Sequence, residues 1–364
     1  MNLAATTGIS DPRQIAFAAS PELLAVVAGM GRTEDVAFSP SNRRIAFAGF
    51  GHNKIIVFDV QLDVVAGGTR VRLTDWVEMK SPSLKRPHGL VFIDEKTLVV
   101  ANRAGDAPIF EVPASGLREK ACVVQPLQTI RCDDAHHLRW PGSVTASSIG
   151  GDRYELLVCN NYIHRVSRHV VERNEKGLVL ESHEILLGEG LSVPDGVAID
   201  RRREWIAISN HGTHTVLLYE NTPSLDLHAK PDGILRNVNY PHGVRFTADG
   251  AFLLVADAGS PYLNVYARGA SWRGARQPHT AIRLLDETTF ERGRYHPTEG
   301  GPKGIDIDQG MNVLVTTCWE QGLAFFDLPA ILREHRVPIG WIGKAIQWRY
   351  ERTRDDLRRR RGWK

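Results

Sequence analysis

Cysteine is scarce in this sequence, and long apolar segments are absent from it. The four cysteines among 364 residues have neither CxxC nor zinc-finger spacing, which argues against a disulfide framework and a cysteine-based zinc module. Cys159 and Cys318 lie within apolar runs, so we expect small buried side chains there. No stretch approaches the run of about 20 apolar residues that a membrane-spanning helix needs.

Targeting signals and common catalytic motifs are also missing. The first residues, MNLAATTGISDPRQ, contain no basic region followed by an apolar core, so we expect no signal peptide and predict a cytoplasmic protein. The sequence has no GxSxG elbow, no P-loop and no HExxH. Serine-nucleophile, nucleotide-phosphate and zincin chemistry therefore lack support.

The positive charge is concentrated at the carboxyl end. The net charge is +3 at pH 7, but residues 351–364 alone contain seven basic and three acidic residues, so the remaining 350 residues sum to −1. A neutral body does not favour nucleic acid as a partner. Residues 329–364 have helical spacing, with Trp341, Ala345 and Trp348 on one face. This predicts an amphipathic helix that packs on the body or docks a protein or an anionic membrane surface.

What the sequence does contain is an internal repeat. Residues 194–220 read PDGVAIDRRREWIAISNHGTHTVLLYE, which is three short apolar runs separated by turns. Val, Ile, Leu and aromatic residues in runs this short favour strands over helices. Similar segments occupy residues 34–60, 87–112, 141–171, 241–268 and 302–328. The period of an internal repeat determines the fold that the repeat can form.

The repeat predicts an all-β fold, a six-bladed β-propeller with a C-terminal amphipathic helical extension. Corresponding turn residues are 54, 54, 53, 47 and 61 residues apart, which is enough for four short strands in each blade. Residues 177–187 and 280–285 are expected to be outer strands. The link before residue 302 is either a lid over one face or an ordinary surface insertion.

The need to close the ring predicts three segments along the chain. Residues 1–33 form an N-terminal lead, in which 14–27 (with IAFAA and LLAVVAG) could add a strand to the sixth blade and leave no open sheet edge. Residues 34–328 form the propeller, and residues 329–364 form the helical basic extension.

Two rings of polar residues should converge at one mouth of the central channel, because each blade points its first strand inward. The first ring occupies the turn before each inner strand and comprises Glu34, His88, Gly142, Asp195, His242 and Lys303. The second ring ends the second strands and comprises Gly49, Asn102, Asn160, Asn210, Asp257 and Thr317, with Arg103, His211 and His214 nearby. His136, His137 and His164 are expected to be surface or packing histidines.

The first ring combines two imidazoles with two carboxylates, which suits a divalent metal ion. We predict Glu34, His88, Asp195 and His242 as metal ligands, although three ligands with an open position are the commoner catalytic arrangement. Asp257, Asn210 and Lys303 are the predicted catalytic residues. The predicted substrate-binding residues are Asn102, Arg103, Asn160, His211 and His214. The alternative interpretation of both rings is a solvated polar channel.

The repeat resembles the NHL and regucalcin/gluconolactonase propellers. The resemblance rests on PHG at 87–89 and 241–243, PDG at 194–196, and Ala-Asn or Ala-Asp at 101–102 and 256–257. It implies a divalent metal serving lactone hydrolysis, with Glu34 and Asp195 in matching positions. Gly142 stands where that family has an asparagine. The histidine turns resemble instead the zinc-dependent peptidyl-hydroxyglycine lyase propellers, which favours zinc, manganese or iron over calcium.

We therefore predict a metal-dependent hydrolase of lactone or ester type, or a lyase, that acts on a small polar substrate at the channel mouth. The alternative is a non-catalytic scaffold that binds a protein or a membrane surface through its face and its C-terminal helix. An enzyme needs the first ring, whereas a scaffold would tolerate its loss.

Overall fold

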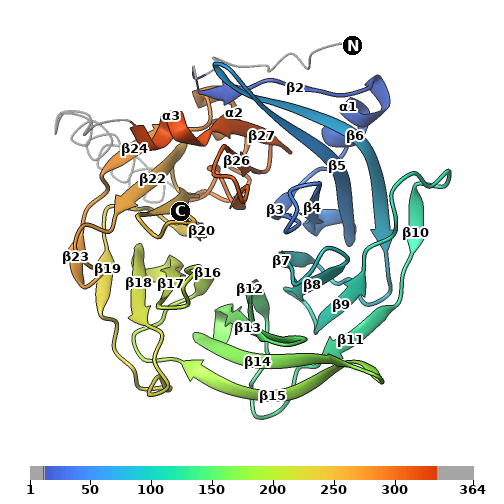
Figure 1. Ribbon diagram of the computed structural model, residues 1–364. Coiled ribbons are helices and arrows are strands. Elements are labelled where there is room, and N and C mark those ends of the chain that lie inside the picture. Colours follow the sequence, from blue (N-terminus) through green and yellow to red (C-terminus); the bar gives the residue numbers. More distant parts are fainter. Residues whose placement is uncertain (1–10, 12, 334–364) are drawn as a thin grey trace, which may run out of the picture.

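The computed structural model describes residue 11 and residues 13–333, and within them six sheets surround a central channel (Figure 1). Blade one contains β3 (Thr33–Phe38), β4 (Arg44–Gly49), β5 (Lys54–Val65) and β6 (Gly68–Lys80). Blade two contains β7 (Pro87–Phe92), β8 (Thr97–Asn102), β9 (Ala107–Glu111) and β11 (Pro126–Ile130). Blade three contains β12 (Pro141–Gly150), β13 (Arg153–Asn160), β14 (Arg165–Asn174) and β15 (Gly177–Leu187).

The remaining blades follow the same antiparallel order from the channel outward. Blade four contains β16 (Pro194–Ile199), β17 (Trp205–Asn210), β18 (Thr215–Glu220) and β19 (Gly233–Leu235). Blade five contains β20 (Pro241–Phe246), β21 (Phe252–Asp257), β22 (Tyr262–Ala267) and β24 (Thr280–Arg283). Blade six contains β25 (Ile305–Ile307), β26 (Val313–Thr316), β27 (Ala324–Asp327) and β1 (Gln14–Ile15). The predicted six-bladed propeller is therefore confirmed.

Three short strands link neighbouring parts of the ring. β10 (Ala121–Val123) and β2 (Phe17–Ala18) pair in parallel with β6, and β23 (Gly274–Arg276) pairs in parallel with β19. Since β10 follows a blade-two strand and β23 follows a blade-five strand, each carries a connecting segment onto the preceding blade.

The ring is closed by its amino-terminal part. Gln14 and Ile15 pair with Phe326 and Phe325 of β27, so the closing strand expected within residues 14–27 lies at its start. The LLAVVAG segment is not a strand but part of α1 (Pro21–Ala28). Ser20 caps this helix by accepting from the Leu23 amide, and Pro21 occupies the first turn, both of which favour helix initiation.

Two further α-helices among the described residues lie late in the chain. α2 (Glu287–Arg292) lies in the link between blades five and six, and α3 (Leu328–Arg333) follows β27. The predicted helix around Trp341–Trp348 and the basic tail lie outside the described residues. Within those described, no helix has the length and apolarity needed to cross a membrane.

The apolar core is divided into clusters between neighbouring blades. For example, Val36, Ile45 and Phe58 of blade one pack with Val315 and Phe325 of blade six. Five further clusters fill the other blade junctions. Because the apolar clusters lie between neighbouring blades, the side chains that face the channel lie outside these clusters and can be polar.

Close approach of the inner strands explains the glycine of the PxG turn. A Cβ on Gly196 would lie 2.0 Å from the carbonyl oxygen of His242, and one on Gly243 would lie 2.6 Å from that of Lys303. Only glycine allows the neighbouring backbone so near. This contact also places the first-ring residues of neighbouring blades next to each other, Asp195 beside His242 and His242 beside Lys303.

Candidate metal and catalytic site

The first-ring side chains converge at one mouth of the channel. A cavity of about 240 Å³ lies there, and its lining includes His88, Asp195, His242 and Lys303. Glu34 is completely buried next to these residues. The predicted convergence of the first ring is thus observed, and the channel is narrow enough for residues of opposite blades to touch.

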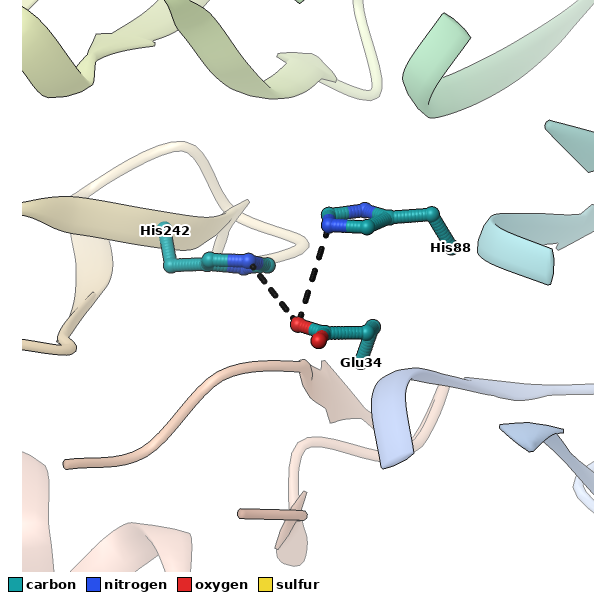
Figure 2. Close-up of side chains that lie close together, drawn as sticks. All are labelled: Glu34, His88 and His242. Atoms are coloured by element: carbon teal, nitrogen blue, oxygen red, sulfur yellow. Dashed lines mark ion pairs between the residues drawn. The ribbon is translucent and has the colours of Figure 1, made fainter. Parts of the chain in front are cut away.

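Glu34, His88 and His242 form a compact cluster (Figure 2). The Glu34 Oε2 atom lies 3.7 Å from His88 Nε2 and 3.5 Å from His242 Nε2. One ligand atom from each residue lies within 4.8 Å of the others. Glu34 Oε2 and His242 Nε2 are both buried without a hydrogen-bond partner. Their contacts are ion-pair contacts to each other, to Asp195 and to Lys303, and buried polar atoms without a hydrogen bond are uncommon enough to suggest a place for a ligand.

The orientation of His88 suits a metal ligand. Its Nδ1 lies 2.7 Å from the Gly142 carbonyl oxygen, so Nδ1 carries the proton and Nε2 offers a lone pair toward the cluster. Arg103 donates to this Nε2 at 2.6 Å. Burial, assisted by the Arg103 charge, lowers the pKa of His88 to about 3, which keeps the imidazole neutral. Gly142 has no ligating side chain, yet its carbonyl group orients the ring.

Asp195 is placed beside the cluster and is held by several donors. Asn161 Nδ2 donates to its Oδ1 at 2.5 Å and Arg103 at 3.2 Å, while His242 Nε2 lies 3.2 Å from its Oδ2. Burial by itself would raise the pKa of Asp195, but His242, His88 and Arg103 hold it well below its usual range. Asp195 is therefore an ionised carboxylate that orients His242 and Arg103.

Lys303 joins the cluster to the link between blades five and six. Its Nζ lies 3.9 Å from Glu34 Oε2 and forms an ion pair with Glu299. Burial would lower the pKa of Lys303, but Glu299 and Glu34 outweigh it and the pKa is raised. Lys303 is consequently a fixed cation, suited to binding an anion rather than to abstracting a proton.

Glu299 was not singled out from the sequence. It bridges Lys303 and His211, whose Nε2 lies 3.2 Å from Glu299 Oε1. Burial opposes ionisation of Glu299, yet Lys303 and His211 lower its pKa strongly. The sequence feature that could have identified Glu299 as a site residue is its position, four residues before Lys303 and next to the Gly300–Gly301 turn. The link therefore supplies residues to the cavity, which agrees with the lid interpretation.

The second ring has a different role from the one predicted. In four blades its side chain accepts a hydrogen bond from the backbone amide three residues before the first-ring position. The pairs are Asn102 with Lys85 (3.0 Å), Asn160 with Arg139 (2.7 Å), Asn210 with Ser192 (2.6 Å) and Asp257 with Asn239 (3.0 Å). None of the four lines the cavity. They fasten the incoming link to the blade, so the catalytic and substrate-binding roles expected for them are not supported by their placement.

Of the other predicted residues, some line the cavity and some bind the backbone of a neighbouring blade. Arg103 and His211 line the cavity, as expected of substrate-binding residues. His214 does not, because its Nδ1 accepts from the Tyr240 amide at 3.1 Å and its ring packs on Tyr240. His164 likewise accepts from the Val193 amide at 2.9 Å. Both histidines connect one blade to the next through the backbone.

Fold and site together define a six-bladed propeller with a buried His–His–Glu cluster at one channel mouth. No family model and no curated protein matches the chain. A structure titled as a luciferin-regenerating enzyme matches with a TM-score of 0.50 and 10% identity, over 79% of this chain and 85% of that one. A functionally unknown protein from Desulfotomaculum acetoxidans DSM 771 matches with a TM-score of 0.48 and 12% identity, over 79% of each chain. At such identities, similarity is limited to the fold.

Proposed function

We propose that the channel mouth is a divalent-metal site that catalyses hydrolysis of a lactone or ester, or a lyase reaction, on a small anionic substrate. The observation that carries the proposal is the cluster of Glu34, His88 and His242. The three residues are buried and each directs one ligand atom toward the others. Two of these atoms, Glu34 Oε2 and His242 Nε2, have no hydrogen-bond partner.

The donor set fits a metal of intermediate softness. Two imidazoles and one carboxylate are a common catalytic zinc set and also suit manganese or iron, whereas calcium prefers more oxygen ligands. Glu34 Oε2 lies 3.7 Å from His88 Nε2 and 3.5 Å from His242 Nε2, so one ion could contact Glu34 together with either histidine. The ion would replace Arg103 at His88 Nε2. Such an ion supplies Lewis-acid polarisation of a carbonyl group or activation of water.

The charges around the cavity favour an anionic substrate. Glu34, Asp195 and Glu299 are balanced by three cations, Arg32, Arg103 and Lys303. A divalent ion added to this balanced set leaves an excess of positive charge, which a carboxylate or phosphate group of the substrate would neutralise. A cavity of about 240 Å³ suits a molecule smaller than most drug-sized ligands.

Proton transfer would fall to His211. This residue lines the cavity, and its two ring nitrogens face Asp195 at 3.8 Å and Glu299 at 3.2 Å. The side chain therefore lies where it could exchange a proton with a bound substrate, which is the geometric requirement for a general base. No serine, threonine or cysteine lies among the described residues that line the cavity, so the proposal uses no covalent nucleophile.

Metal content of the purified, untagged protein is the first test, measured by mass spectrometry before and after chelation. We expect near-stoichiometric zinc, manganese or iron at this site, lost in Glu34→Gln and retained in Glu111→Gln, an exposed control at the end of β9. A panel of anionic lactones, esters and lyase substrates then follows with the loaded protein. Incorporation of labelled solvent oxygen into product distinguishes hydrolysis from elimination.

Two outcomes would redirect the proposal. If the purified protein contained calcium and no other divalent metal, a calcium-dependent reaction of the lactonase type would be favoured. If the protein held no metal and showed no thermal shift with any divalent ion, the cluster would be a polar channel and the scaffold alternative would replace the enzyme. The predicted C-terminal extension on which that alternative depends, residues 329–364, lies mostly outside the described residues.

A further inference from the structure

A second group of histidines lies far from the channel, on the outer side of blade three. Asp133 and His137 belong to the link that enters this blade, and His169 and His183 belong to its outer strands β14 and β15. The two strand histidines are direct cross-strand partners, so their side chains are on the same face of the sheet. Three imidazoles and one carboxylate thus meet where the link crosses the blade.

The geometry of this group is that of a potential ligand set. One ligand atom from each of Asp133, His137 and His183 lies within 4.8 Å of the others. The His137 and His183 rings are stacked, with centroids 4.3 Å apart and an angle of 11°. Asp133 Oδ2 lies 2.8 Å from His137 Nδ1. Two stacked imidazoles beside a single carboxylate repel each other if both are protonated, but they can share one cation when neutral.

His169 provides an independent observation. It is completely buried, its Nε2 contacts the Ser167 hydroxyl at 2.9 Å, and its Nδ1 has no hydrogen-bond partner. Its ring lies edge-on to that of His183, with centroids 6.2 Å apart. A buried imidazole with an unsatisfied nitrogen thus lies next to the exposed His183.

We infer that Asp133, His137 and His183 form a second divalent-metal site, of the zinc class, that fastens the link onto β15. Imidazole and carboxylate ligands suit zinc, with copper or nickel as competitors. Asp133 Oδ2 and His137 Nδ1 are already 2.8 Å apart, and rotation of the exposed His183 side chain would bring a ring nitrogen toward the same point. His169 lies behind it as a fourth group.

The site is structural rather than catalytic. Its members come from a connecting link and an outer strand, and the link also carries Arg139, whose amide is held by Asn160. An ion here would tie the same link at a second point. This inference is independent of the function proposed for the channel, since the two clusters share no residue.

Zinc titration of the full-length protein against a chromophoric chelator tests the inference. We expect two equivalents for the wild type and one for His183→Gln, with His228→Gln, another exposed histidine, as the matched control that keeps both. Asp133→Asn should lose the same equivalent, and Asp134→Asn should not. Glu34→Gln should lose the other equivalent, so failure of the channel site and failure of this site are distinguishable.

A spectroscopic and a stability measurement complete the test. Cobalt bound to the Glu34→Gln variant should give visible absorption bands, and these bands should be absent from the double variant Glu34→Gln/His183→Gln. Zinc should raise the Tm of Glu34→Gln but not that of the double variant. Equal zinc binding by His183→Gln and the wild type would overturn the inference. So would a Tm that responds to pH but not to zinc, since the group would then be a histidine–aspartate ion pair only.

Discussion

The imidazole rings of His88 and His242 stack on each other, with centroids 5.3 Å apart and an angle of 23°, although they belong to blades two and five. Both rings direct Nε2 toward the same oxygen of Glu34, a residue of blade one. Contact between opposite blades shows that the channel is narrow at this mouth. A single ion can therefore be reached from three blades at once.

The first prediction concerns these two rings. The double variant His88→Ala/His242→Ala should lose the metal of the channel site while remaining folded, because it removes two of three ligands and leaves the blade cores unchanged. Metal content by mass spectrometry, with circular dichroism as the folding check, measures this. Full metal occupancy at the channel in a folded double variant would show that the ligand assignment is wrong.

The second prediction concerns the ion pair of Lys303 and Glu299. Lys303→Met should lower the free energy of unfolding by about 3–5 kcal/mol, because it removes the lysine partner of the half-buried Glu299 and one of the two cations at the buried Glu34, which keeps only Arg32. Glu299→Gln should cost less, since Glu34 still neutralises Lys303. Urea unfolding of both variants and the double variant should show coupling of about 0.5–3 kcal/mol. Strict additivity of the two changes would contradict the pairing.

The third prediction concerns the hydrogen bonds that hold the links. Asn160→Ala should cost about 1–3 kcal/mol, because it leaves the Arg139 amide without its acceptor. Asn160→Asp should cost less, since aspartate keeps the acceptor, as Asp257 does in blade five. Chemical denaturation measures both. Zinc affinity at the channel should stay unchanged in both, and a large loss would mean that Asn160 serves the site directly.

The fourth prediction concerns pH. Burial and Arg103 lower the pKa of His88 to about 3, against 6.5 for an ordinary histidine. Below pH 6.5 the unfolded chain binds a proton that native His88 does not, so stability falls as the pH drops from about 6.5 toward 3, and this residue has no effect above 6.5.

At pH 5.0 this contribution amounts to about 2 kcal/mol. Urea unfolding of chelated protein at pH 7.5 and pH 5.0 should show a smaller decrease for His88→Gln than for the wild type. His169, whose pKa is also about 3, should leave a residual decrease in that variant. An identical decrease in both proteins would show that His88 is protonated in the native state.

The repeat was sufficient to predict the architecture. Short apolar runs between turns, recurring six times, identify blades, and residues 177–187 match β15 (Gly177–Leu187) at both ends. The places of His88, Asp195 and His242 followed too, because each PxG triplet begins the inner strand of its blade. His88 and His242 were therefore found without any knowledge of their distance.

The sequence could not show what each polar side chain contacts. Asn160 and Asp257 occupy equivalent repeat positions at the end of a strand, but only the folded chain shows that they bind the backbone of the incoming link instead of facing the cavity. Within residues 14–27, which were expected to supply the closing strand, only the start does so; the apolar run that follows lies in α1, where Ser20 and Pro21 favour helix initiation.

Period and turn chemistry are local properties, so the sequence by itself determined the six blades and the residues that open on the channel. Contacts between distant segments depend on how variable links cross the assembled ring. Glu299 reached Lys303 and His211, and Asp133 and His137 reached His183, only through the tertiary structure. Those links carry no repeat, and their positions are set by packing against blades that lie far away in the sequence.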